Sequence, residues 1–337
     1  MKQNPKQEKS MKRRYSVFLG NVGSCSDRYC PSYAPEFKLE SLFARVASIP
    51  LVTAVDLVAT PDLLKHHDLV KRLVKESGLT VASVAADTFT QACWKSGSFS
   101  ARDPKTRAAA VAHAKETMDL AESLGSDLLT LWPGQDGYDY HFQADYIAAR
   151  QGFIECLREL CAYKPAMRVG VEYKLKEPRN RIYTNTVGTT LLMVQATGCA
   201  NCQVIMDYGH AVLAQENPAE SVALLAQFGK RLGHIHINDN YGYWDDDMIV
   251  GSVHANAYLE FFYWLRRTGY DGWMTIDQYP YREDGRNAVA ESAEWLDWLE
   301  SLLDRADLGE IDGVLAQGDG VASSRLMRQL LSGGSRA

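Results

Sequence analysis

The sequence predicts an α/β fold, a (β/α)8 TIM barrel with a C-terminal extension, from two observations. Short apolar segments rich in Val, Ile, Leu and Thr, as strands buried on both faces are, recur along the chain. Segments with 3.6-residue periodicity lie between them. Eight such alternations close most naturally into a barrel of parallel strands. The expected strands are Tyr15–Gly20, Leu51–Asp56, Thr80–Ala85, Asp127–Trp132, Arg168–Tyr173, Gln203–Asp207, Gly233–Asn238 and Trp273–Asp277.

The helical segments are recognised by apolar residues that return to one face. Glycines such as Gly78 and Gly269 stand where a helix should stop and the chain should turn. The expected helices are Pro61–Glu76, Pro104–Leu124, His141–Tyr163, Ala219–Leu232, Ala255–Arg267 and Asn287–Leu303.

An open, doubly wound sheet is the alternative architecture. Such a sheet usually carries a glycine-rich phosphate loop after its first strand. Here the segment 20–25 lacks the third glycine, and no clearly capped helix follows it. The pattern therefore favours the barrel.

The chain divides into three parts. Residues 1–14 are polar and lysine-rich and predict a disordered tail, neither a secretory signal nor a transit peptide. Residues 15–303 form the catalytic barrel. Residues 304–337 are a polar, glycine-rich extension with one short apolar helix, Val321–Leu331. Two interpretations of this extension stay open: an oligomerisation arm that packs on another subunit, or a loosely ordered end.

Composition excludes several classes of protein. The chain of 337 residues is 46% hydrophobic and 23% charged, which is ordinary for a globular protein. With 36 basic and 42 acidic residues the net charge is −6, which argues against a nucleic-acid partner. No apolar run of about 18 residues exists, so no membrane span is expected.

Cysteine usage indicates a reducing compartment. Seven cysteines, an odd number, are spread along the chain, and we expect a cytoplasmic protein with buried thiols. Cys199 and Cys202 form a single C-x-x-C pair without the second pair that a zinc ribbon needs, so their role is structural.

Chemistry is expected where the strands end, because barrel active sites lie at the C-terminal ends of the strands. Four consecutive strands end in Glu172, Asp207, His236 and Asp277. Three converging carboxylates would repel one another, and an unpaired buried charge is costly. A bound divalent cation would offset this repulsion most simply. Three oxygen donors and one imidazole suit Mn²⁺ first, with Mg²⁺ or Co²⁺ as alternatives.

A second ion is expected close to the first. His210 follows Asp207 by three residues, which places both on one side of a helical turn. Asp245 and Asp247 are two apart in a loop and can point at one spot. With Asp207 as the bridge, these residues complete a second ligand set, so two ions per subunit are expected.

Other histidines receive structural interpretations. His234 lies on the same face of its strand as His236 but one layer deeper, where we expect a hydrogen bond within the barrel core. His66 and His67 lie in a helical pattern and are expected at the surface.

An ordered set of motifs resembles the xylose isomerase-like superfamily. Segments 87–99, 131–137, 172–179 and 245–251 are similar in turn to the motifs of xylose isomerases around their strands three, four and five and their metal loop. The segment 236–239, His-Ile-Asn-Asp, is closer to the L-rhamnose isomerase branch. The resemblance covers roughly residues 80–280.

The resemblance implies a metal-dependent sugar isomerase that interconverts an aldose and a ketose by a 1,2-hydride shift. Lys174 would bind the carbonyl oxygen, with Trp132 and Trp94 walling the pocket and His210 also contacting the sugar. The substrate would be an unphosphorylated pentose, deoxyhexose or branched sugar, and the enzyme a homo-oligomer, a dimer or a tetramer.

One departure from the family concerns ring opening. Xylose isomerases carry a His–Asp pair at strand two, and here Asp56 is present without the histidine. We therefore expect the sugar to arrive as an open chain, to be a furanose or a branched sugar, or to have its ring opened by another residue.

Three other functions remain open. A single-metal ketose 3-epimerase of the tagatose-epimerase type would use Glu172 and Asp277 as base and acid on opposite faces of one carbon. An endonuclease of the same superfamily would need more histidines and a basic face. A non-catalytic sugar-binding barrel would not need intact ligand sets.

Overall fold

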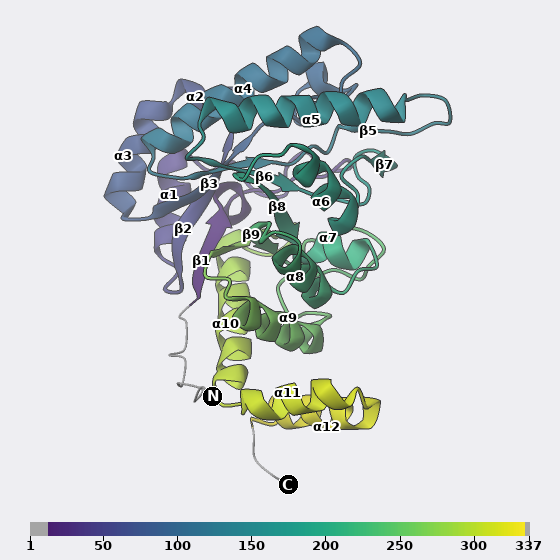
Figure 1. The fold of residues 1–337 in the computed structure, drawn as a ribbon. Helices are drawn as coiled ribbons and strands as arrows, with labels where there is room; N and C mark the ends of the chain where they lie inside the picture. The colour runs from purple at the N-terminus through teal and green to yellow at the C-terminus, as the bar shows by residue number, and fades with distance from the viewer. Residues whose placement is uncertain (1–12, 334–337) are drawn as a thin grey trace.

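A computed structural model describes residues 13–333 of the chain, and these residues form a closed barrel of eight parallel strands (Figure 1). The order around the barrel follows the chain, and the last strand closes on the first. The predicted (β/α)8 barrel is confirmed. Its strands are β1 (Arg14–Phe18), β2 (Val52–Ala59), β3 (Thr80–Ala86), β4 (Leu128–Leu131), β6 (Arg168–Glu172), β8 (Cys202–Asp207), β9 (Leu232–Ile237) and β10 (Trp273–Ile276).

All eight predicted strands exist, with bounds that differ by at most one residue at the N-terminal end and at most three at the C-terminal end. Their side chains are almost entirely buried, because helices cover the outside and neighbouring strands fill the inside. The parallel register brings the C-terminal ends of β6, β8, β9 and β10 to one rim: Glu172 pairs with Ile205, and Asp207 with His236.

The helices surround the barrel, and each predicted helix is present with altered bounds (Figure 1). The helix predicted over Pro61–Glu76 is two helices that meet at His66. The helix predicted from His141 begins at Tyr146, where Asp145 caps the first turn. The corresponding helices are α2 (Pro61–Lys65), α3 (His67–Ser77), α4 (Pro104–Ser123), α5 (Tyr146–Tyr163), α8 (Pro218–Gln227), α9 (Ala255–Thr268) and α10 (Gly285–Asp304).

Sequence periodicity missed several short elements. α1 (Leu39–Ala47) and α7 (Tyr208–Leu213) are brief, and α6 (Val187–Ala196) is apolar on most of its sides, which erases the periodic signal. A two-stranded ribbon, β5 (Gly137–Tyr138) with β7 (Arg181–Ile182), joins the loops that follow β4 and β6.

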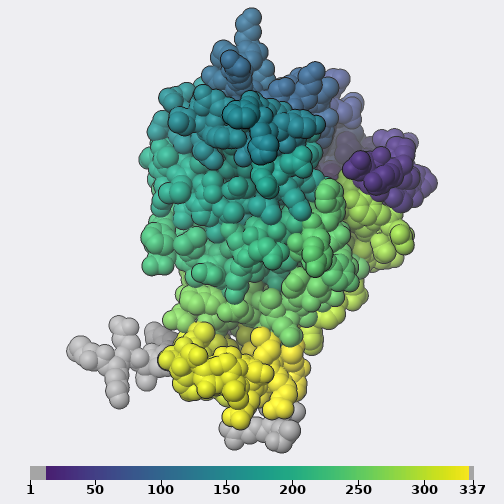
Figure 2. All heavy atoms as spheres, turned by 90° about the vertical axis from the view of Figure 1, so that its right-hand side faces the viewer, coloured from purple at the N-terminus to yellow at the C-terminus, as the bar shows by residue number. Residues whose placement is uncertain are grey.

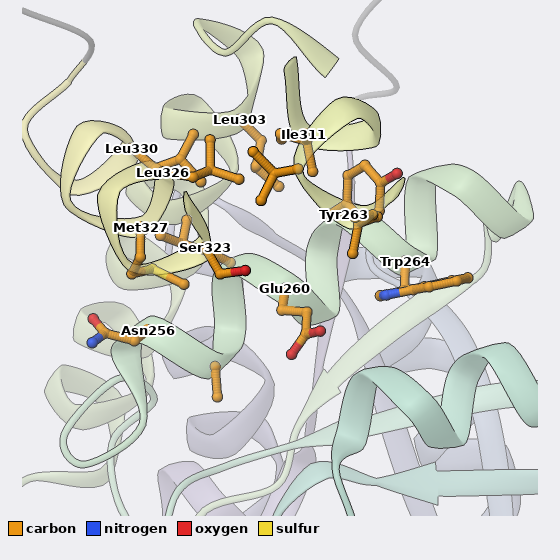
Figure 3. Close-up of a pocket in the computed structure, with 14 residues that line it drawn as sticks. Asn256, Glu260, Tyr263, Trp264, Leu303, Ile311, Ser323, Leu326, Met327 and Leu330 are labelled. Carbon is orange, nitrogen blue, oxygen red and sulfur yellow. The ribbon is translucent and has the colours of Figure 1, made fainter. Parts of the chain in front are cut away.

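The C-terminal extension is a helical hairpin beyond the end of α10 (Figures 1 and 2). The predicted helix Val321–Leu331 is present as α12 (Gly320–Leu331), and α11 (Leu308–Gln317) precedes it unpredicted. The hairpin meets α9 around a cavity of about 360 Å³ lined by Tyr263, Ile311 and Leu326, among others (Figure 3).

The expected tail needs a correction at its inner boundary. Residues 1–12 lie outside the described residues. Arg14 begins β1, and Arg13 is buried with its Nε donating to Glu300 Oε1 at 2.7 Å. Both arginines therefore belong to the barrel. No helix within residues 13–333 is long and apolar enough to cross a membrane.

Candidate metal centre and active site

Four predicted ligands converge at the rim of the barrel. Glu172 and Asp207 are the last residues of β6 and β8, His236 lies one residue before the end of β9, and Asp277 follows β10. One ligand atom from each lies within 4.8 Å of the others. The closed parallel barrel produces this convergence, because strand ends that are distant in sequence meet around one opening.

The contacts within this set leave ligand positions free. Glu172 Oε2 lies 3.2 Å from His236 Nδ1, and Glu172 Oε1 lies 3.2 Å from His210 Nδ1. Both ring nitrogens of His236 are buried without a hydrogen-bond partner among the described residues. Asn21, which sequence reasoning missed, donates from Nδ2 to Asp277 Oδ1 at 3.1 Å.

Electrostatics also indicate that a cation belongs here. Burial raises the pKa of Asp277 to about 7, and the neighbouring carboxylates of Glu172 and Asp207 add to the effect. Burial would lower the pKa of His236, but Glu172 and Asp277 raise it to about 10. A set of crowded carboxylates beside an unpartnered imidazole fits a divalent cation. Its three oxygens and one nitrogen suit Mn²⁺, Mg²⁺ or Co²⁺.

The second predicted set lies at the same rim but does not converge in the same way. His210 Nε2 lies 3.1 Å from Asp245 Oδ2. Asp247 Oδ1 and Asp207 Oδ2 each accept a hydrogen bond from Asn238 Nδ2 at 3.1 Å. Within residues 13–333, Asp207, His210, Asp245 and Asp247 do not form a group with all ligand atoms within 4.8 Å of one another.

Backbone conformation holds this second set in place. Asp247 has a φ of 47°, a left-handed value that is unusual for a residue other than glycine and is found at functional sites. Gly209 allows Asn238 to pack between the two sets, since a Cβ at Gly209 would lie 2.0 Å from Asn238 Oδ1. Burial and the Asp245 carboxylate raise the pKa of Asp247 well above its ordinary value.

Lys174 is buried at the edge of the second set. Its Nζ lies 2.7 Å from Asp245 Oδ2 and 2.8 Å from Glu177 Oε2. Burial would lower the pKa of Lys174, but the carboxylates of Asp245 and Glu177 raise it above its ordinary value. The side chain therefore presents a buried ammonium group. Sequence reasoning missed Glu177, although it follows Lys174 by three residues.

The two predicted aromatic wall residues differ in what they contact. The Lys174 ammonium lies 5.2 Å from the centre of the Trp132 ring, whose other neighbour is Phe89 at 4.7 Å. Trp94 is buried in the loop between β3 and α4, and its carbonyl accepts a hydrogen bond from Gly97. The indole nitrogens of both tryptophans have no partner among the described residues.

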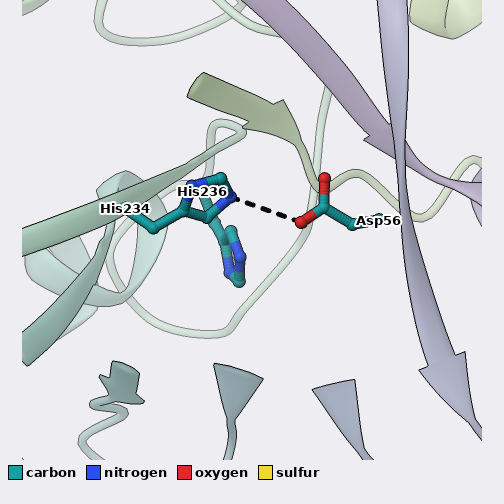
Figure 4. A group of neighbouring side chains, drawn as sticks. All are labelled: Asp56, His234 and His236. Atoms are coloured by element: carbon teal, nitrogen blue, oxygen red, sulfur yellow. Dashed lines mark ion pairs between the residues drawn. The ribbon is translucent and has the colours of Figure 1, made fainter. Parts of the chain in front are cut away.

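Beneath the rim, Asp56 and His234 lie beside His236, and one ligand atom from each of the three lies within 4.8 Å of the others (Figure 4). His234 Nε2 lies 2.7 Å from Thr275 Oγ1, which donates to Asp56 Oδ1 at 2.9 Å, and Ser83 donates to the other oxygen of Asp56. The expected hydrogen bond of His234 in the core is confirmed. Asp56 is fully buried in this layer, so it does not stand free at the mouth to open a sugar ring.

Other predicted side chains lie away from the rim. The side chains of His66 and His67 are about half exposed, as expected. The seven cysteines are free thiols, and Cys202 is buried at the start of β8. Neither Cys199 nor Cys202 belongs to a metal-ligand group among the described residues.

Comparison with known proteins identifies relatives of this chain and structures that share its fold. Xylose isomerase from Thermus thermophilus is 30% identical over 225 residues, which are 65% of this chain and 58% of that protein. The chain thus spans less than two thirds of the length of that relative. The crystal structure of a D-tagatose 3-epimerase-like protein, 20% identical, superposes with a TM-score of 0.66 over 85% of this chain and 98% of its own. That of a D-psicose 3-epimerase in the presence of D-fructose, 16% identical, has a TM-score of 0.63 over 84% and 99%.

A sequence model of one family covers most of the barrel. Its description is xylose isomerase-like TIM barrel, and it matches residues 47–299. This range includes β2 to β10 and all the predicted ligands. With three quarters of its length matched and the barrel closed as the family name requires, this chain belongs to the xylose isomerase-like TIM barrel family.

Proposed function

We propose that this protein is a metal-dependent sugar isomerase that interconverts an aldose and a ketose by a 1,2-hydride shift. Its substrate is an unphosphorylated pentose, deoxyhexose or branched sugar. The observation that carries the proposal is Lys174, a buried ammonium group held by Asp245 and Glu177 beside the converged ligands. The similarity to a xylose isomerase supports the same reaction.

Two ligand sets would hold the cations that this chemistry uses. Glu172, Asp207, His236 and Asp277 would hold the first cation, and Asp207, His210, Asp245 and Asp247 the second. Mn²⁺ is the preferred ion, with Mg²⁺ or Co²⁺ as alternatives. When bound, such ions supply Lewis acidity that polarises the sugar oxygens.

The protein groups stabilise the charge that moves during the reaction. Hydrogen leaves the hydroxyl-bearing carbon with its bonding electrons and joins the neighbouring carbonyl carbon. The proton of that hydroxyl passes to the former carbonyl oxygen, so the product is the isomeric carbonyl compound. Lys174 Nζ donates a hydrogen bond to the carbonyl oxygen as negative charge develops on it. His210 contacts the sugar, and Trp132 and Trp94 exclude water from the pocket.

The extension and the cysteines support two further parts of the proposal. Helix α12 has no buried residue, and Val321 on it is 60% exposed. We propose that α11 and α12 pack on another subunit in a homo-oligomer, a dimer or a tetramer. Light scattering of the full chain and of a chain ending at Asp304 tests this, and an equal mass per particle, after allowing for the deletion, contradicts it. Free thiols suit a cytoplasmic location.

A single-metal ketose 3-epimerase is the second candidate. The observation that favours it is that only the first of the two predicted ligand sets converges within residues 13–333. In that reaction Glu172 and Asp277 would act as base and acid on opposite faces of one carbon. The D-tagatose 3-epimerase-like structure shares the fold. The epimerase reaction assigns no role to Lys174 or Asp247.

Reaction in deuterated water separates the two candidates. The protein is treated with a chelator, reloaded with Mn²⁺ and incubated with a panel of aldoses and ketoses. Conversion between an aldose and a ketose with little deuterium in the product supports the isomerase. Full deuterium incorporation at carbon three of a ketose supports the epimerase. Conversion that persists without added metal contradicts both.

A further inference from the structure

A hollow separate from the cavity at the C-terminal hairpin opens beside the proposed metal ligands Asp245 and Asp247. It lies between the loops that follow β9 and β10 and has a volume of about 460 Å³. Asp245 and Asp247 line it, so it borders the proposed reaction site. Lys174 and Trp132 do not line it. The hollow therefore extends the site away from the ammonium group that would bind the reacting carbonyl oxygen.

A buried glutamine whose amide nitrogen has no partner among the described residues lines this hollow. Gln278 lines it and is 1% exposed. Ser292 Oγ accepts a hydrogen bond from Val250 N at 3.1 Å and donates its single proton to Gln278 Oε1. This arrangement assigns the amide orientation and leaves Gln278 Nε2 without a partner among the described residues. A buried donor left unpaired is costly, so a ligand oxygen is its natural partner.

Aromatic side chains also line this hollow. Tyr279, Tyr281 and Trp244 line it, and Trp244 is 48% exposed. The Tyr281 ring lies 5.5 Å from that of Tyr279 and 5.4 Å from that of Tyr33, which holds it in place. The C–H face of a pyranose packs against such rings while its hydroxyl groups reach polar atoms at the edge.

We infer that this hollow is a subsite for a second sugar ring, so that the reacting sugar named in the proposed function is the reducing end of a disaccharide. The inference rests on the proposed function, because the reducing-end sugar is the one that would react beside Lys174. The second ring packs on Tyr281 and Trp244, and one of its hydroxyl oxygens accepts a hydrogen bond from Gln278 Nε2.

The size of the hollow agrees with this ligand. Cavities of about 300–1,000 Å³ bury drug-sized molecules, which are larger than one monosaccharide. The hollow, with about 460 Å³, has room for one sugar ring. Asp245 and Asp247 line the hollow on the side of the proposed metal ligands.

Binding of sugars that cannot react tests the subsite directly. Protein loaded with Mn²⁺ is titrated by calorimetry with methyl β-cellobioside and with methyl β-glucopyranoside, which lack a reducing end. We expect the disaccharide to bind at least tenfold more tightly. Tyr281→Ala and Gln278→Leu should each remove most of that advantage, and Tyr243→Ala, an exposed aromatic outside the hollow, should keep it. Equal affinity for the two glycosides overturns the inference.

Turnover measurements then connect the subsite to the reaction. Cellobiose is compared with glucose, and xylobiose with xylose. We expect kcat/KM to be at least tenfold higher for one disaccharide than for its monosaccharide, and Tyr281→Ala to reduce that ratio below threefold. A higher kcat/KM for both monosaccharides overturns the inference. If the disaccharide glycoside binds as expected but no reducing sugar is converted, the proposed function fails and the subsite stands.

Discussion

Two histidines on β9 lie two residues apart and face the same interior, yet their surroundings differ. His234 is held by Thr275 and lies 3.3 Å from Asp56, in a layer where the polar atoms pair with one another. His236, one layer nearer the mouth, has no hydrogen-bond partner on either ring nitrogen among the described residues. Burial lowers the pKa of His234, whereas Glu172 helps to raise that of His236 to about 10.

The comparison separates a hydrogen-bonded layer from the layer that we propose holds a cation. A buried polar group normally finds its partner within the protein, as His234 does. Where a buried group is left unpartnered beside carboxylates, the missing partner is a ligand, and here a cation fits. Residue type alone cannot distinguish the two histidines, because both are imidazoles on one strand face.

The largest expected effect is the loss of a cation ligand. In His236→Asn the first set loses its nitrogen donor, and we expect turnover to fall at least about a thousandfold, equivalent to several kcal/mol of lost charge stabilisation. Metal content by mass spectrometry should fall with it, while circular dichroism stays unchanged. His67→Asn, on an exposed helix, is the matched control. Full metal content in His236→Asn would show that the histidine is not a ligand.

Lys174→Met should lower kcat by about a hundred- to a thousandfold, because an electrostatic donor aimed at developing charge contributes that much. Metal binding should remain, since the ammonium group is not a ligand. Steady-state kinetics and calorimetric Mn²⁺ titration measure the two properties. A change in kcat within about threefold, well under 1 kcal/mol in barrier, contradicts the proposed role.

A substitution in the layer of Asp56 and His234 should lower the free energy of unfolding and leave metal affinity nearly unchanged. Asp56→Asn places an amide nitrogen where the carboxylate accepts hydrogen bonds from Thr275 and Ser83, and a buried donor left unsatisfied costs about 1–3 kcal/mol of unfolding free energy. Chemical denaturation measures this loss. Mn²⁺ affinity should stay within about threefold, less than 1 kcal/mol. A large loss of metal affinity in a folded variant would mean that the two layers are not separate.

The smallest expected effect concerns the second ligand set. Asp245→Asn should weaken one cation by about ten- to a hundredfold and spare the other, as loss of a supporting group around a metal does. Two-site analysis of Mn²⁺ titrations resolves the two affinities. Equal weakening of both ions would show that the two sets act as one site, which would favour the epimerase.

Much of the barrel could be predicted because its signal is local. Alternation of apolar and periodic segments identifies strands and helices one at a time, and residues at strand ends can be placed at one rim by topology alone. Glu172, Asp207, His236 and Asp277 were found in this way, and the structure brings them together. The sequence did not predict helix α6, because a helix that is apolar on most sides has no hydrophobic periodicity to detect.

The amino-acid sequence by itself determined the number of barrel strands, the fold class and which ionisable groups stand at the ends of those strands. The tertiary structure decided which of these groups have hydrogen-bond or ion-pair partners. It paired Asp56 with His234, held Lys174 between Glu177 and Asp245, placed His236 Nδ1 3.2 Å from Glu172 Oε2, and left Gln278 Nε2 without a partner among residues 13–333. The reason is physical: strand patterns arise from near neighbours, whereas hydrogen bonds across a closed barrel join residues that are far apart in the chain.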